Sequence, residues 1–229
     1  MRRYDLLLEG EYYHVYNRGA HKQDLFLEEI DYRRFQLLLH ILNTSQRVVI
    51  RDLLQRYRGR SSVDIFHLEH TDHALVDIMA YCLMPNHFHL ILRQKSPDGI
   101  SIFMKKLATA YAMYYNLKYE HSGVLFQGRF KSKHVGEDAY FRWLFSYVHL
   151  NSIDLVEPGW KEKGLQDMNR TRSFVNTYPY SSFVDYLGPE RPERALLAYT
   201  DAPEFVRQEN DLELLIRSLA AENTKDRPL

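Results

Sequence analysis

Apolar and polar residues follow two different periods along this chain. In residues 11–17 they alternate and include several β-favouring residues, which is typical of a strand, and Arg18-Gly19 closes it. In residues 28–43, apolar residues recur three and four positions apart, which predicts a helix. The same criteria predict strands at 63–70, 75–84 and 87–93, one or two short strands within 123–135, helices at 101–119 and 137–150, and helical stretches near 195–199 and 202–219.

This order of elements predicts an α+β fold, in which helices pack on one face of an antiparallel sheet. Met84-Pro85-Asn86 lies between two of the strands and is expected to form the turn of a hairpin. Residues 154–172 are rich in Gly, Pro and charged residues, which is typical of a loop or linker. We therefore expect one domain over residues 1–155, followed by a linker and a mostly helical C-terminal extension over residues 156–229.

The composition excludes several classes of protein. The 229 residues are 45% hydrophobic and 26% charged, so the chain can bury a core and is not expected to be disordered. The single cysteine, Cys82, excludes a disulfide scaffold and is interpreted as a small buried apolar side chain. No apolar run approaches the roughly 20 residues of a membrane span, and the N-terminal apolar stretch is too short for a signal peptide. We therefore expect a cytoplasmic protein with no membrane contact.

Charge is balanced over the whole chain but unevenly distributed. The formal net charge is 0, yet residues 101–135 contain six basic residues and one acidic residue, and residues 185–229 contain ten acidic and six basic residues. A basic middle segment favours a surface that binds an anion, although an unevenly solvated surface would give the same pattern. The candidates for phosphate contacts are Arg18, Arg129, Lys131 and Lys133.

A pair of histidines in the predicted strand 87–93 is the first candidate for chemistry. Residues two apart on a strand point to the same side of the sheet, so His87 and His89 project side by side and Phe88 points to the opposite side. Two imidazoles on one rigid strand supply half of a metal site. The alternative is a purely structural pair.

A tyrosine and an asparagine four residues apart are the second candidate. Tyr147 and Asn151 lie at the end of the predicted helix 137–150 and share one of its faces. A phenol has a pKa near 10 and is a poor nucleophile, but it can attack a phosphodiester that a divalent metal polarises. His87, His89 and the amide oxygen of Asn151 would supply three ligands for Mg²⁺ or Mn²⁺, with Tyr147 as the nucleophile. The alternative is that Tyr147 only packs under the sheet and Asn151 only ends the helix.

Five segments, in order along the chain, carry a resemblance to a known family. They are 13–19 (YHVYNRG), 87–89 (HFH), 122–131 (SGVLFQGRFK), 147–151 (YVHLN) and 180–186 (YSSFVDY). Together they resemble the single-tyrosine HUH transposases, most closely the branch associated with repetitive extragenic palindromes (REP).

The resemblance implies a ferredoxin-like α+β fold, binding of single-stranded or hairpin DNA, and metal-dependent DNA cleavage. On this family's pattern, Tyr147 attacks a DNA phosphate, a 5′-phosphotyrosine link forms and a free 3′-OH leaves. A later 3′-OH reverses the step and joins strands. His87 and His89 match the family's metal pair, Asn151 matches its third ligand, and a monomer or homodimer is expected.

Two other functions stay open at this point. The chain could bind hairpin DNA without cutting it, as a protein derived from a transposase. It could also hydrolyse small phosphoesters with the same two histidines and a water nucleophile. His14 and His149 are interpreted as polar fillers rather than ligands.

Overall fold

The central element of the fold is a four-stranded antiparallel sheet. The computed structural model describes residues 7–60, 65–66, 73–204 and 212–221. In chain order, the sheet and its first two long helices comprise β1 (Tyr12–Arg18), α1 (Glu29–Ile41), β2 (Val76–Met84), β3 (His87–Gln94), α4 (Gly99–Lys118) and β4 (Lys131–Val135). The strand order is β2-β3-β1-β4, and each neighbouring pair is antiparallel. This βαββαβ arrangement is the ferredoxin-like topology.

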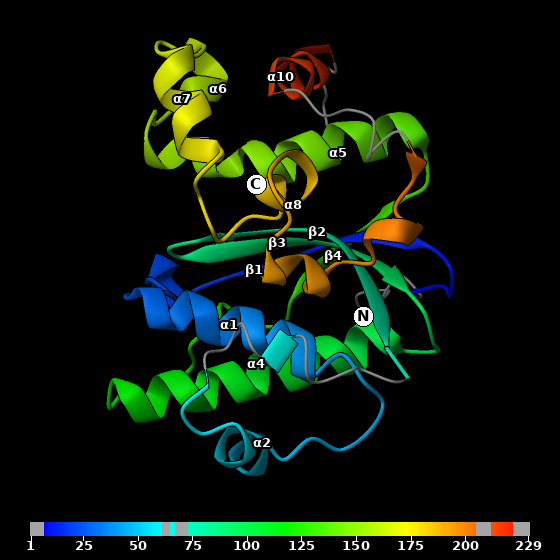
Figure 1. Cartoon of the computed structure of the whole chain (residues 1–229), viewed down its shortest axis with the longest axis vertical. Coiled ribbons are helices and arrows are strands. Elements are labelled where there is room, and N and C mark those ends of the chain that lie inside the picture. The colour runs from blue at the N-terminus through cyan, green and yellow to red at the C-terminus, as the bar shows by residue number, and fades with distance from the viewer. Residues whose placement is uncertain (1–6, 61–64, 67–72, 205–211, 222–229) are drawn as a thin grey trace.

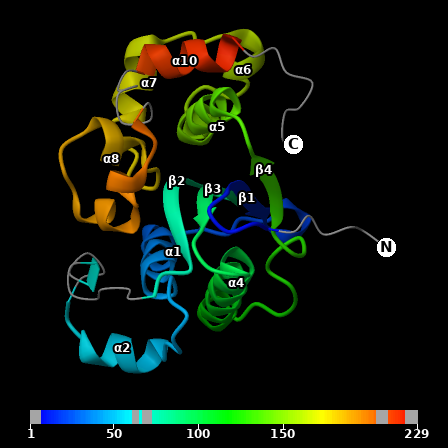
Figure 2. The same ribbon diagram turned by 90° about the vertical axis from the view of Figure 1, so that its right-hand side faces the viewer.

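The two faces of the sheet are covered by different helices (Figures 1 and 2). α1 and α4 lie on one face, where Val15 of β1 and Phe88 of β3 join their core. The helix α5 (Asp138–Leu150) lies on the other face, where Ile91 of β3 joins a second core. Alternation along the strands assigns each side chain to one core or the other.

The α+β class and the antiparallel sheet are confirmed, but helices cover both faces of the sheet rather than one. α5 was expected among the helices of a single face, and it covers the face opposite α1 and α4 together with the C-terminal elements. The physical reason is visible in β2, where all nine residues are buried. A strand buried on both sides requires a layer on each face.

The other described elements are η1 (Ala20–Lys22), α2 (Ile50–Arg56), η2 (Asn151–Leu155), α6 (Trp160–Lys163), α7 (Met168–Val175), α8 (Phe183–Leu187), η3 (Pro192–Leu196), η4 (Tyr199–Asp201) and α10 (Leu212–Ala221).

The segment predicted as a linker is partly helical, because α6 lies within it and α7 begins in it. The carboxylate of Glu157 orders the predicted linker, since it accepts hydrogen bonds from the backbone of Gln166 and Asp167 and from the Thr171 hydroxyl. The division into two domains at residue 155 stays a prediction.

Two smaller expectations concern strands. Most of the predicted strand 63–70 lies outside the described residues, and its two described residues, Ile65 and Phe66, are helical and buried. In residues 123–135, only β4 forms a strand; Phe126 makes an isolated bridge to Gly19. None of the described helices is long and apolar enough to cross a membrane.

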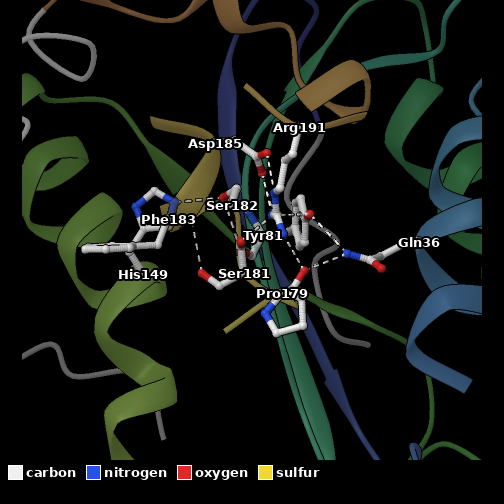
Figure 3. Close-up of polar contacts among 9 residues, drawn as sticks. All are labelled: Gln36, Tyr81, His149, Pro179, Ser181, Ser182, Phe183, Asp185 and Arg191. Carbon is white, nitrogen blue, oxygen red and sulfur yellow. Dashed lines mark hydrogen bonds and ion pairs between the residues drawn. The ribbon is translucent and has the colours of Figure 1, made fainter. Parts of the chain in front are cut away.

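The segment 178–186 lies along the outer edge of β2, where Ser181 forms an isolated antiparallel bridge with Cys82, and Ser182 links it to His149 of α5 (Figure 3). The backbone N–H groups of Leu83 and Ser182 donate to the carbonyls of Tyr180 and Tyr81 across this edge, at 2.9 Å each. The Ser182 hydroxyl donates to the Tyr81 carbonyl and accepts from the Tyr81 N–H. Its oxygen therefore accepts from Nε2 of His149, 2.7 Å away on α5. Because Ser182 is fully buried, this serine–histidine contact holds α5 in place and is closed to a substrate.

The buried His149 makes stability depend on pH. Burial lowers its pKa from 6.5 to about 3, so the folded state keeps the ring neutral while the unfolded state binds a proton below pH 6.5. The contribution of the neutral His149 ring to the free energy of unfolding is complete above pH 6.5 and is lost as the pH falls toward 3. The loss amounts to about 2 kcal/mol at about pH 5. Urea unfolding at about pH 7.5 and pH 5 measures this effect. Between these two pH values, we expect the free energy of unfolding of His149→Gln to fall by about 2 kcal/mol less than that of wild type. Equal losses in the two proteins would contradict this assignment.

Candidate active site

The two histidines of β3 lie on the face of the sheet that α5 covers. Arg18 pairs with His87 and Tyr16 with His89 across β1 and β3, which places these four side chains on one face. The rings of His87 and His89 are 5.0 Å apart between centres and nearly perpendicular. His89 is buried and His87 partly exposed, so the pair extends from the core to the surface.

Each of these rings has its Nδ1 occupied by a neighbouring side chain. Nδ1 of His89 lies 2.9 Å from Nε2 of His14, and both rings are buried. Nδ1 of His87 lies 2.7 Å from the Oδ1 of Asn86 in the hairpin turn. Both histidines therefore retain Nε2 for a ligand, in the arrangement that second-shell hydrogen bonds impose on metal-binding histidines.

Tyr147 reaches the histidine pair from α5. Its ring centre is 5.5 Å from that of His89, and the two rings meet edge to face. The ring of Trp143 stacks on it at 5.3 Å, one helical turn earlier. Burial raises the pKa of Tyr147, and contact with the Asn151 side chain partly offsets this shift. At neutral pH Tyr147 is therefore a protonated phenol.

Asn151 lies between the tyrosine and the histidines. α5 ends at Leu150, and Asn151 is its C-cap and the first residue of η2. Its side chain lies close enough to His87 and Tyr147 to raise the pKa of the imidazole and to lower that of the phenol. Its Nδ2 is buried and has no hydrogen-bond partner among the described residues. The unpartnered N–H group is a hydrogen-bond donor that an anion such as phosphate could accept, whereas the amide oxygen is the atom that could bind a metal.

The donor set fits a divalent metal. Burial lowers the pKa of His87 to about 4 and that of His89 well below its usual range, so both rings are neutral and available as ligands near pH 7. Within the described part of the chain, no three His, Cys, Asp or Glu side chains gather as a metal site. The third protein donor would therefore be an amide, and the oxygen of Asn151 is the group in place. Two imidazoles and an amide oxygen suit Mn²⁺ and are compatible with Mg²⁺.

Three of the four predicted basic residues share the face of the histidine pair. Arg18 carries a buried Nε without a hydrogen-bond partner among the described residues, and its charge lowers the pKa of His87. Lys131 pairs with Tyr16 in the sheet, and Lys133 pairs with His14. Arg129 is exposed in the loop before β4. Their role in DNA binding stays a prediction.

Sequence reasoning missed two residues of this site. His14 was interpreted as a polar filler, because its contact with His89 requires knowing that β1 and β3 are neighbours. Lys161 fell in the predicted linker, although its Nζ lies 4.7 Å from the centre of the Tyr147 ring. The alternation of apolar and polar residues in β1 could have shown which face of the sheet His14 occupies. No sequence pattern indicates that Lys161 lies near Tyr147.

The arrangement brings together the phenol of Tyr147, the imidazoles of His87 and His89, and the ammonium group of Lys161. Residues 63–151, which include His87, His89, Tyr147 and Asn151, match the model of the family described as "Transposase IS200 like". This segment is similar to the IS200-like transposases. The match covers less than half of the chain and leaves β1 and the C-terminal elements outside it. It confirms the predicted resemblance to this group of transposases.

Two solved structures are similar to the chain at low identity. A REP-associated tyrosine transposase bound to a REP hairpin is 15% identical, with a TM-score of 0.46, over 81% of this chain and 82% of that one. The tRNA(His) guanylyltransferase of Saccharomyces cerevisiae is 10% identical, with a TM-score of 0.38, over 90% of this chain and 87% of that one. Both are too distant to assign a function. A search of curated proteins found no match.

Proposed function

We propose that this protein is a divalent-metal-dependent transposase that cleaves and rejoins single-stranded hairpin DNA through a 5′-phosphotyrosine intermediate. The observation that carries the proposal is the position of Tyr147, whose ring lies 5.5 Å from that of His89 within the segment that is similar to IS200-like transposases. Chain segments far apart in sequence supply the two rings, and α5 and β3 are the elements that bring them together.

His87, His89 and Asn151 would hold Mg²⁺ or Mn²⁺ through two Nε2 atoms and an amide oxygen. When bound, the metal would polarise a phosphodiester and stabilise the charge of the leaving oxygen. His14 would fix the orientation of His89, since its Nε2 can accept a hydrogen bond from Nδ1–H of His89. That tautomer leaves Nε2 of His89 unprotonated and able to bind a metal.

Tyr147 would act as the nucleophile. Its hydroxyl oxygen attacks the phosphorus, the bond between phosphorus and the 3′ oxygen breaks, and the phenol proton is lost as the departing 3′ oxygen gains one. The 5′ phosphate of the downstream strand stays on Tyr147. A later 3′-OH attacks this phosphotyrosine and restores the phenol. Arg18, Arg129, Lys131 and Lys133 would hold the flanking phosphates.

A covalent-adduct assay tests the proposal. The protein is mixed with a pool of single-stranded oligonucleotides that each carry a hairpin beside a randomised segment and a label at the 3′ end. The 3′ label follows the strand that stays on the enzyme. We expect a labelled protein band with Mn²⁺ or Mg²⁺ and none with EDTA. Hairpin binding without any adduct would favour a non-catalytic DNA-binding protein, and labelled fragments without an adduct would favour a water nucleophile; both contradict the proposal.

The role assigned to His14 gives a prediction that needs no DNA. His14→Leu removes the acceptor behind His89 and is expected to weaken Mn²⁺ binding about 10- to 100-fold, because second-shell partners fix ligand orientation. Isothermal titration with Mn²⁺ measures the affinity, and thermal unfolding checks that the variant folds. His134→Leu, at an exposed histidine of β4, is the matched control and should bind Mn²⁺ like wild type. Unchanged affinity in His14→Leu would contradict the assigned role.

A further inference from the structure

The short helix α6, which follows η2, places a lysine side chain over the ring of Tyr147. α6 (Trp160–Lys163) is anchored by Trp160, a residue only 6% exposed that belongs to the same hydrophobic core as the buried side of α5. The next residue, Lys161, extends over the face of the Tyr147 ring, with Nζ 4.7 Å from the ring centre. Trp160 thereby fixes the start of a lysine side chain that ends beside the proposed nucleophile.

An ion pair holds the Lys161 ammonium group in this position. Its Nζ lies 3.2 Å from a carboxylate oxygen of Asp154 in η2. The Lys161 side chain is 24% exposed, so it lies along the protein surface rather than extending into solvent. An ammonium group has three hydrogen-bond donors, and Asp154 occupies one of them. Among the described residues no other side chain accepts from this group, so two donors are available to another anion.

The charge of Lys161 also reaches the histidine pair. It lowers the pKa of both His87 and His89, in addition to the larger effect of burial. Asp154 acts in the opposite direction on His87 and raises the pKa of Tyr147. Lys161 and Asp154 are therefore close enough to the proposed reaction site to influence its charge.

We propose that Lys161 contacts the phosphate that Tyr147 attacks, so that the segment after residue 155 supplies a catalytic residue to the site. The inference rests on the proposed function. In-line attack on a phosphodiester increases the negative charge on its non-bridging oxygens, and a cation fixed beside the nucleophile stabilises that charge. Asp154 is a positioning residue, which holds the ammonium over the ring before DNA binds.

The test compares a charged and an uncharged scissile linkage. Once the adduct assay has identified a cleaved oligonucleotide, it is synthesised with either the natural phosphodiester or a neutral methylphosphonate at that position. Single-turnover rates of adduct formation are measured for wild type, Lys161→Met, Lys161→Arg and Lys163→Met. Lys163 lies in the same short helix but is exposed, and its replacement removes the same charge.

On the phosphodiester, Lys161→Met should react about 10- to 100-fold more slowly than wild type, as expected for the loss of one charge-assisted hydrogen bond. Lys163→Met should react like wild type, and Lys161→Arg should retain most of the rate. On the methylphosphonate, the difference between Lys161→Met and wild type should become much smaller, because an uncharged methyl group replaces one of the two non-bridging oxygens and the linkage has no net charge for Lys161 to neutralise.

The outcomes separate this inference from the proposed function. Failure of wild type to form an adduct with any oligonucleotide overturns both. A wild-type adduct with an unimpaired Lys161→Met overturns the inference alone. An equal loss of rate on both linkages does so too, since it would show that Lys161 only supports the Tyr147 ring. Thermal unfolding of Lys161→Met should match wild type and its Mn²⁺ affinity should not fall, because the substitution removes a positive charge near the histidines; these two results exclude misfolding and loss of the metal as causes.

Discussion

Replacing Tyr147 by phenylalanine is expected to abolish the covalent adduct and strand joining while the protein stays folded. The substitution removes only the hydroxyl oxygen and keeps the ring that stacks on Trp143 and meets His89. Loss of a covalent nucleophile lowers catalysis by at least about 10⁴-fold in enzymes where it has been measured, because no other group takes its place. Mn²⁺ affinity should be unchanged, since the proposed ligands are on other residues.

Tyr140→Phe is the matched control for this prediction. Tyr140 lies seven residues earlier on the same face of α5. Its ring also stacks with that of Trp143, with the ring centres 5.7 Å apart. It should form the adduct at the wild-type rate. If Tyr147→Phe still forms an adduct, the nucleophile is another residue, and Tyr16 would be examined next because its ring lies 5.8 Å from that of His89.

Replacing Arg191 by methionine is expected to destabilise the fold by about 3–5 kcal/mol, the cost of breaking a buried ion pair. Arg191 donates to both carboxylate oxygens of Asp185, at 2.7 and 2.8 Å, and Asp185 is fully buried (Figure 3). It also donates to the carbonyls of Pro179 and Ser181. Its loss leaves the Asp185 carboxylate and the Ser181 carbonyl without this donor, whereas the Pro179 carbonyl still accepts from Gln36 at 3.0 Å. Urea unfolding measures the change.

Arg172→Met serves as the control for Arg191→Met. Arg172 forms an ion pair with Glu213 at 3.0 Å, but both side chains are about half exposed. Surface pairs of this kind contribute about 0–1 kcal/mol. A loss of similar size in the two variants would contradict the structural role of Arg191.

Because Ser182 connects the same segment to His149 of α5, Arg191→Met should also slow adduct formation by loosening the helix that carries Tyr147.

The sequence predicted the elements that have a clear period and the site residues that share an element. His87 and His89 lie two apart on one strand, and Tyr147 and Asn151 lie four apart on one helix, so local geometry alone pairs them. The topology of the sheet was reached through the family resemblance. The position of α5 on the opposite face was not predicted, because periodicity shows that a helix has an apolar side but not which surface that side contacts.

The residues that sequence reasoning missed act through contacts between distant segments. His14 contacts His89, which lies 75 positions later in the sequence, across two neighbouring strands. Lys161 belongs to a four-residue helix in a segment rich in Gly, Pro and charge, where composition favours a loop. Arg191 is one of six basic residues in an acidic tail, and only the fold shows that it is the partner of a buried carboxylate.

Mapping of the nucleotide-bearing peptide tests directly whether Tyr147 forms the covalent link to DNA. Trypsin cleavage after Arg142 and Lys161 releases residues 143–161, in which Tyr147 is the only tyrosine. The wild-type adduct is digested with nuclease and trypsin, and the peptides are sequenced by tandem mass spectrometry. We expect a residual nucleotide joined through phosphate to Tyr147. A nucleotide on the peptide that contains Tyr16, or on any other peptide, would contradict it.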